Sequence, residues 1–359
     1  MKTIKFVNKD RGQFTATLRK NVNDYFAKNN ISTKGNAKMV IKCIVMLSLY
    51  FTPFILFLIF PFNAWAFFLL SILMGIGMAG IGMSVMHDAV HGSFSKKSWL
   101  NKLVGSTIYF IGGNMFNWHI QHNVMHHTFT NIDGYDEDIE PKGSLRLSKQ
   151  SPLKKIHRFQ HIYAFFLYCL MSIARFFKEI SQLIKYNKAG ITRQHGTTPK
   201  KEMTRLIFAK IIYLSVIFIL PIVFSGFSWW IVMLGFLVMH AVSGLVMGTV
   251  FQMAHVVEDV DQPMPTNGII ENEWTIHELE TTANFSRKSR WFGWWIGGLN
   301  YQIEHHLFPH VCHVHYPAIS PIVEKTAKEF GLRYNENRTF LNALGSHIRT
   351  LKALGKQQQ

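Results

Sequence analysis

The chain has 359 residues, of which 48% are hydrophobic and 18 are histidines, and its formal net charge at pH 7 is +17. In a soluble protein this charge would suggest binding to nucleic acid, but basic segments beside a membrane also lie on anionic lipid headgroups. The three cysteines form no C-x-x-C pair, which argues against a disulfide scaffold and a cysteine-ligated cluster. We therefore expect membrane lipid as a partner and no nucleic acid.

Residues 1–37 are polar and strongly basic, and they precede the first apolar run. Basic residues beside a membrane span usually stay in the cytoplasm, so we expect a cytoplasmic N-terminal leader here. The leader shows no cleavable signal peptide and no histidine pair that could bind haem. It is also too short to form a separate electron-transfer domain.

Four apolar runs have the length needed to cross a hydrocarbon core of about 30 Å, and they cover residues 41–61, 64–86, 205–225 and 229–253. They form two close-set pairs, and the turns near 61–63 and 225–228 contain no charged residue. A very hydrophobic soluble core would not explain four such runs in two pairs. The sequence therefore predicts an all-α integral membrane protein with four transmembrane helices in two hairpins. Both termini and the long middle segment are expected in the cytoplasm.

Other segments are expected at the membrane surface or in the cytoplasm. Residues 100–116 are apolar and contain glycine, which suggests a surface or re-entrant helix. Residues 162–177 have the pattern of an amphipathic helix at the interface. Residues 326–359 are expected to form a cytoplasmic C-terminal tail.

Histidines gather at the cytoplasmic ends of the predicted spans. His87 and His91 stand four apart, and on an α-helix residues with this spacing share a face. His122 and His126 repeat the spacing, and His127 would point about 100° away, towards a second metal.

A third cluster contains His305 and His306, with Gln302 four residues before His306, and His255 ends the fourth span. A single cluster could be structural, but all four sites lie on one side of the membrane. Imidazole suits iron, zinc, copper and nickel, and eight histidines are too many for one ion. The pattern therefore predicts a site for two metal ions.

The sequence resembles the membrane fatty acid desaturases. The resemblance rests on three boxes, which read His87-Asp88-Ala-Val-His91, His122-Asn-Val-Met-His126-His127 and Gln302-Ile-Glu-His305-His306-Leu-Phe-Pro. Most desaturases have histidine first in the third box, and Gln302 in its place is typical of the front-end group. The resemblance covers roughly residues 40–325, so we expect a desaturase domain over residues 38–325. It is greatest to bacterial acyl-CoA or acyl-lipid desaturases of linoleoyl-CoA type.

The resemblance implies a cytoplasmic helical cap that holds a histidine-rich di-iron site. Its expected iron ligands are His87, His91, His122, His126, His127, His255, His305 and His306. Gln302 would ligate iron or hold a bound water, and both alternatives stay open. O2 is the implied co-substrate, and the expected product is a cis double bond near carbon 5 or 6 of an acyl chain carried on CoA or lipid. Because no cytochrome b5 domain is fused to the chain, ferredoxin or a separate cytochrome b5 would donate the electrons. The resemblance to bacterial enzymes suggests that the protein lies in a bacterial inner membrane.

Carboxylates usually orient metal-bound imidazoles, and Asp88 and Glu304 are candidates for this role. Asp136 and Asp138 stay open between the same role and a solvated acidic turn. His119 could be a ninth ligand, but it lies off the faces used by the second box. The histidines near the third box are candidates for contacts with ligands or headgroups, namely His277, His310, His313 and His315. The remaining histidines are expected at the surface or in packing contacts, namely His157, His161, His195, His240 and His347.

Two other functions fit part of this pattern. A di-iron membrane hydroxylase of lipids or alkanes would share the histidine boxes, although Gln302 and the His-His-Leu-Phe-Pro sequence favour desaturation. A histidine-rich metal transporter would need ionisable residues in mid-membrane, and the four spans contain almost none.

Overall fold

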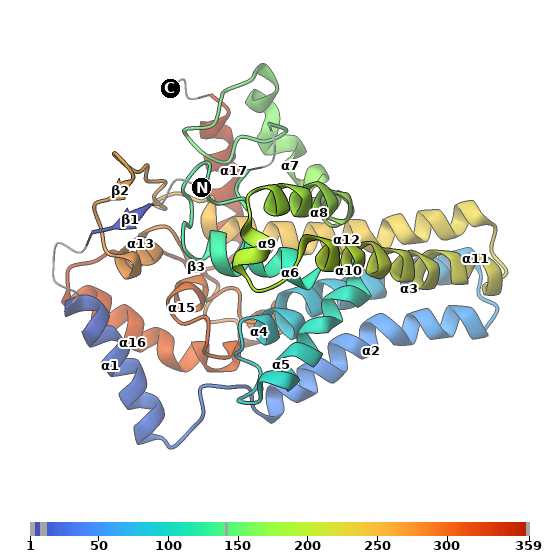
Figure 1. The fold of residues 1–359 in the computed structure, drawn as a ribbon, viewed down its shortest axis with the longest axis horizontal. Helices are drawn as coiled ribbons and strands as arrows, with labels where there is room; N and C mark the ends of the chain where they lie inside the picture. The colour runs from blue at the N-terminus through green and yellow to red at the C-terminus, as the bar shows by residue number, and fades with distance from the viewer. Residues whose placement is uncertain (1–3, 8–12, 141–142, 357–359) are drawn as a thin grey trace.

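The computed structural model describes residues 4–7, 13–140 and 143–356. Long helices run side by side towards one end of the molecule, and shorter helices gather at the other end (Figure 1). The described strands form two parallel pairs of two residues each, β1 (Lys5–Phe6) with β2 (Ile269–Ile270) and β3 (Asn284–Phe285) with β4 (Glu336–Asn337). The described fold is therefore helical, as the sequence predicts.

Four helical spans are long and apolar enough to cross a membrane. They are α2 (Ala37–Ile59), then α3 (Ala64–Gly80) with η1 (Ile81–Val85) and α4 (Met86–Val90), then α10 (Pro199–Leu214) with η5 (Ser215–Ile219) and α11 (Leu220–Phe224), and finally α12 (Trp229–His255). The four predicted spans are thus confirmed as helices of the required length and composition.

Two of these spans begin earlier than the sequence predicts. The first begins at Ala37 rather than 41, because the side chain of Asn36 accepts a hydrogen bond from the backbone N–H of Lys38. The third begins at Pro199 rather than 205, because Thr198 caps its first turn in the same way. Hydropathy detects only the apolar part of a helix, whereas a capped helix continues into the polar residues beyond it.

Small residues let α3 pack directly against its neighbours. A Cβ atom added to Gly77 would lie 2.6 Å from the backbone nitrogen of Tyr50 on α2. One added to Gly75 would lie 2.7 Å from the carbonyl oxygen of Met239 on α12. Such close backbone contact is typical of packing between membrane helices. The two hairpins are therefore joined along α3.

The middle of the chain is built from short helices. Residues 100–116 form α5 (Ser98–Gly105), η2 (Ser106–Ile111), a turn at 112–114 and the start of α6 (Met115–Trp118), and the second box lies in η3 (His119–His126) and the residue after it. The predicted interfacial helix at 162–177 is two helices that meet at Leu170, after η4 (Lys155–Phe159). They are α7 (Gln160–Cys169) and α8 (Met171–Lys188), and α9 (Ile191–Gln194) follows. Their exposed Ile162, Phe166 and Phe177 suit contact with lipid.

A buried polar cluster ties α12 to α8 and α10. Ser172 donates to the carbonyl oxygen of His240 (2.8 Å), so its oxygen is free to accept from Nδ1 of the same residue (2.9 Å). Nε2 of His240 then accepts from the hydroxyl of Tyr213, at 2.9 Å. His240 is therefore a buried packing residue whose two ring nitrogens both have partners.

The segment after α12 holds the third box and folds back on the rest of the cap. Its helices are α13 (Trp274–Glu280), α14 (Arg290–Trp295), α15 (Gln302–Leu307), η6 (His313–His315), α16 (Tyr316–Glu329) and α17 (Phe340–Leu354). The helix α16 runs through residue 325, where the sequence placed the end of the desaturase domain, and α17 packs against α7 and α12. The described part of residues 326–356 therefore packs against the rest of the chain.

The leader also packs on the cap. Its helix α1 (Gln13–Lys28) buries Phe14, Leu18, Val22 and Phe26 in one cluster with residues of α15 and α16. Residues 1–3 and 8–12 of the leader and residues 357–359 of the tail lie outside the described residues. The division of the chain at 37 and 325 stays a prediction.

Candidate metal centre

Histidines from three boxes and from α12 meet at the cap end of the spans. The side-chain nitrogens of one group lie within 4.8 Å of one another, and the group contains His87, His91, His122 and His305. His91 is half-buried, and the other three are buried. Its members come from α4, η3 and α15, which are far apart in the chain. This set is called the first subsite below.

A second group of buried histidines lies beside the first. His126, His255 and His306 form one set with nitrogens within 4.8 Å, and this set is called the second subsite below. His127 forms another such set with His305 and His306. The ring centre of His127 lies 4.7 Å from that of His91 and 4.4 Å from that of His306. All eight predicted histidines therefore gather in one place, with His127 between the two subsites.

His122 and His126 of the second box lie side by side, as the sequence predicts, but on a different kind of helix. We expected His122 and His126 to serve one metal from one α-helical face. In the structure η3 is a π-helix, in which hydrogen bonds join residues five apart. The backbone N–H of His127 donates to the carbonyl oxygen of His122 at 3.0 Å. The ring centres of His122 and His126 are 5.1 Å apart, and the two form a set with Asp138, while His122 also belongs to the first subsite and His126 to the second.

The chemistry of these nitrogens fits a pair of metal cations. Nε2 of His91, His126, His255, His305 and His306 is buried and has no hydrogen-bond partner among the described residues. Burial, with the neighbouring imidazoles, lowers the pKa of His122, His127, His305 and His306 well below the usual value. Neutral imidazoles with unpaired nitrogens are what a divalent metal ion binds.

Acidic residues near the second box orient two of its histidines. Nδ1 of His126 donates to Asp136 at 3.0 Å, and Nδ1 of His122 lies 3.4 Å from Asp138. Asp136 is fully buried and also accepts from the backbone N–H of Asn131. Burial lowers the pKa of His126, but the carboxylate of Asp136 outweighs this effect and the pKa is raised. The sequence leaves Asp136 open between orienting a histidine and lying in a solvated acidic turn. Its burial and its contact with His126 fit the first alternative and not the second.

Glu278 on α13 holds His306, and the sequence did not identify it. Nδ1 of His306 donates to Oε2 of Glu278 at 2.6 Å, and Thr130 donates to the same oxygen at 2.8 Å. Burial raises the pKa of Glu278 well above its usual value. The only signal in the sequence is position, because Glu278 lies between Trp274 and the Thr282–Asn284 stretch that precede the third box.

Of the two predicted carboxylates, Asp88 lies beside a box histidine and Glu304 does not. Oδ2 of Asp88 accepts from Nδ1 of His313 at 2.7 Å, and Oδ1 lies 3.6 Å from Nδ1 of His87. Glu304 accepts from the hydroxyl of Tyr334 (2.6 Å) and from the amide of Asn284 (2.8 Å) instead of from a ligand histidine. Glu304 points away because it lies on the opposite side of the short helix α15 from the metal-facing histidines.

Other predicted positions take definite places. Gln302 begins α15 and is 1% exposed, and its Oε1 atom has no hydrogen-bond partner within the described part of the chain, which fits either alternative left open for it. His277 lies against the ring of Phe6, with ring centres 5.1 Å apart. His315 is 3.0 Å from the carbonyl oxygen of Lys34, and His119 belongs to none of the histidine groups.

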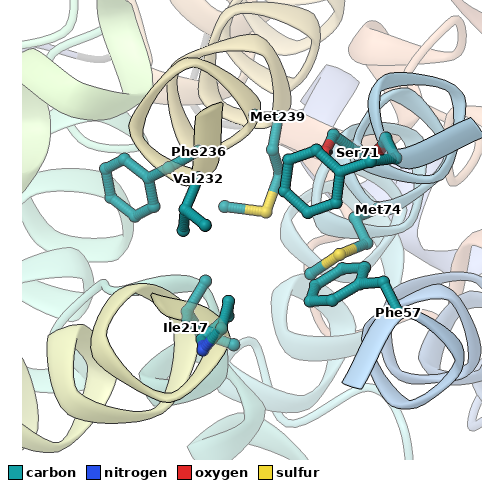
Figure 2. A pocket seen from close by; sticks show the side chains of 10 residues that line it. Phe57, Ser71, Met74, Ile217, Val232, Phe236 and Met239 are labelled. Atoms are coloured by element: carbon teal, nitrogen blue, oxygen red, sulfur yellow. Dashed lines mark hydrogen bonds between the residues drawn. The ribbon is translucent and has the colours of Figure 1, made fainter. Parts of the chain in front are cut away.

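Apolar rings line the histidine groups. The ring centre of Trp118 lies 4.5 Å from that of His122, and the ring centre of Phe251 lies 5.1 Å from that of His126. Deeper between the spans is an apolar pocket lined by Phe57, Ser71, Met74, Ile217, Val232, Phe236 and Met239, among others (Figure 2). Its volume of about 10 Å³ holds about one water molecule. An acyl tail would need these side chains to move before it could enter.

Comparison with known proteins supports the same reading. The sequence pattern of the family described as "Fatty acid desaturase" matches residues 63–338. The "sn-1 linoleoyl-lipid 6-desaturase" of Synechocystis sp. is 35% identical over 98% of this chain and 98% of its own length. The "Acyl-lipid (8-3)-desaturase" of Physcomitrium patens is 34% identical over 98% of this chain and 74% of its own length. The "sn-1 linoleoyl-lipid 6-desaturase" of Arthrospira platensis is 33% identical over 95% and 92%, respectively.

The match covers more than half of the chain and includes all three histidine boxes, which the structure brings together. The resemblance to desaturases that was inferred from the three boxes alone is therefore confirmed, and the chain belongs to the fatty acid desaturase family.

Proposed function

We propose that this protein is a front-end fatty acyl desaturase, which uses O2 and two iron ions to introduce a cis double bond near carbon 5 or 6 of a lipid-linked acyl chain. Desaturation itself follows from family membership. The observation that carries the rest is the meeting of eight histidines, seven of them buried, beside Gln302. The substrate class is supported by relatives that act on acyl lipids and are named 6-desaturases or (8-3)-desaturases.

The two subsites suggest how the irons divide among the ligands. The first subsite would hold one ion and the second subsite the other, with His127 and His305 close to both. Gln302 would ligate iron or hold a bound water. Bound iron supplies the oxidising power for removing hydrogen from an unactivated methylene, which no side chain has.

The protein's own residues orient the ligands and exclude water. Asp136 and Glu278 each accept the Nδ1 proton of a ligand histidine, which directs Nε2 towards the metal. Trp118 and Phe251 place apolar rings beside these ligands, where a methylene chain would be in a dry environment. A dry site favours removal of hydrogen from the chain over side reactions with water.

Feeding linoleate to cells that express the protein tests this proposal. We expect a new polyunsaturated acid with an added double bond at carbon 5 or 6, found by mass spectrometry of the lipids. His126→Ala should abolish the product while the protein still inserts into the membrane, and the exposed His195→Ala is the matched control. A product that gains one oxygen and no double bond would identify a hydroxylase. Tightly bound zinc without O2-dependent turnover would favour a metal transporter.

The orientation in the membrane and the electron donor are part of the proposal. Basic residues flank the spans on the side of the histidines, so we place both termini and the active site in the cytoplasm of a bacterial inner membrane. A single cysteine introduced into the turn at 225–228 should then react with an impermeant reagent in intact cells. Reduced ferredoxin should support turnover of the purified protein, and cytochrome b5 is the alternative donor to compare.

A further inference from the structure

A lysine lies buried on the first span, although this span contributes no predicted metal ligand. Lys42 on α2 is 1% exposed, and its Nζ atom lies 2.6 Å from Nε2 of His313. The same Nζ atom sits 5.2 Å from the ring centre of Trp294. A buried ammonium group loses its hydration, so it persists only where its partners offset that loss. The partners of Lys42 therefore require an explanation.

The hydrogen bonds of this cluster can run in one direction only. An ammonium group has no acceptor, so Lys42 donates and Nε2 of His313 accepts. The proton of the imidazole must then be on Nδ1, which donates to Oδ2 of Asp88 at 2.7 Å. Cys312 donates to the same oxygen at 3.0 Å. Lys42 and Asp88 thus form an ion pair that is bridged by a neutral imidazole.

The other oxygen of Asp88 faces the first histidine box. Oδ1 of Asp88 lies 3.6 Å from Nδ1 of His87, an atom that forms no hydrogen bond with any residue that the structure describes. Asp88 also follows His87 directly in α4. A carboxylate held at this position can accept the Nδ1 proton, which leaves Nε2 of His87 for a metal.

We propose that Lys42 is a positioning residue for the first subsite: through His313 it fixes the carboxylate of Asp88, which in turn orients His87. The inference rests on the proposed function, because it needs a metal at His87. Without Lys42, Nε2 of His313 has no donor, and the imidazole is free to change its tautomer and release Asp88. The first span thereby acts on the metal site through His313, which is 271 positions away in the chain.

The test compares Lys42→Met with Lys38→Met in the purified full-length protein. Lys38 lies one turn earlier on α2 and is exposed, so it is the matched control. Metal-free protein is titrated with Co²⁺, whose visible absorption reports the number and geometry of its ligands, and bound iron is counted after reconstitution. We expect Lys42→Met to weaken binding at one of the two metal positions by about 10- to 100-fold. The other position and Lys38→Met should match the unaltered protein.

Variants of His313 keep the test decisive if Lys42→Met does not fold. His313→Gln has an amide that can accept from Lys42 and donate to Asp88, so it should bind metal better than His313→Leu. The double variant Lys42→Met/His313→Leu should lose no more affinity than either single variant, because all three break one pathway. The inference would be overturned if either Lys42→Met or His313→Leu bound Co²⁺ with the same affinity and the same spectrum as the unaltered protein. If the unaltered protein binds fewer than two ions, the proposed function itself fails.

Discussion

Replacing Glu278 tests whether a buried carboxylate that the sequence did not reveal controls the second metal. Glu278 is fully buried, and its Oε2 atom accepts from His306 at 2.6 Å and from Thr130 at 2.8 Å. Glu278→Gln keeps the shape and one acceptor oxygen but removes the negative charge, which the Nδ1 donor of His306 stabilises although burial raises the pKa of the carboxyl group. Glu278→Ala removes both hydrogen bonds and leaves a cavity.

The expected loss follows from the strength of these bonds. A hydrogen bond to a charged group contributes about 1.5–3 kcal/mol, against about 0.5–1.5 kcal/mol for a neutral pair. Glu278→Gln should therefore weaken binding of one metal ion by about 1–1.5 kcal/mol, which is about tenfold. Glu278→Ala should cost about 1.5–3 kcal/mol, or roughly 10- to 150-fold.

The assay is titration of the metal-free protein with Co²⁺, together with the iron content after reconstitution. Glu304→Gln is the matched control, because Glu304 is equally buried but accepts from Tyr334 and Asn284. The control should lower thermal stability and leave metal affinity within about twofold of the unaltered protein. The reasoning is refuted if Glu278→Gln binds both ions normally, or if Glu304→Gln loses as much affinity as Glu278→Gln.

Three further predictions concern stability. Burial lowers the pKa of His347 to about 4, so between pH 6.5 and 4 the unfolded chain takes up a proton at this histidine more readily than the folded chain. The docking of α17 should therefore be fully stable above about pH 6.5 and weaken by about 3 kcal/mol as the pH falls to 4. Hydrogen exchange of the α17 backbone amides measures this loss. His240→Leu should lower the free energy of unfolding by about 1–3 kcal/mol because Ser172 and Tyr213 lose a partner, and unchanged melting in detergent would contradict this. Leu18→Ala should weaken the docking of α1 by about 2–5 kcal/mol, seen as faster proteolysis of α1 than in a variant of the exposed Lys20.

Much of this fold could be read from the sequence because its signals are local. The spans are runs of apolar residues, and their length follows from the thickness of a bilayer. The uncharged turns and the basic leader predict that the histidines lie on one side of the membrane. Helix ends were less accurate, as at Ala37 and Pro199, because capping by Asn36 and Thr198 acts beyond the apolar residues. The packing of α1 on α16 was not foreseen, because amphipathicity does not specify a partner.

For the metal centre, the sequence by itself determined which histidines gather, because the three boxes and the end of α12 are fixed by spacing and topology. Only the tertiary structure decided how they are grouped, because each subsite combines histidines from helices that are separate in the chain. It also brought Glu278 to His306 and Lys42 to His313. The members of each pair lie on different helices, whereas spacing along the sequence indicates only which residues share a face of one helix. Contacts between helices depend on how the whole molecule packs.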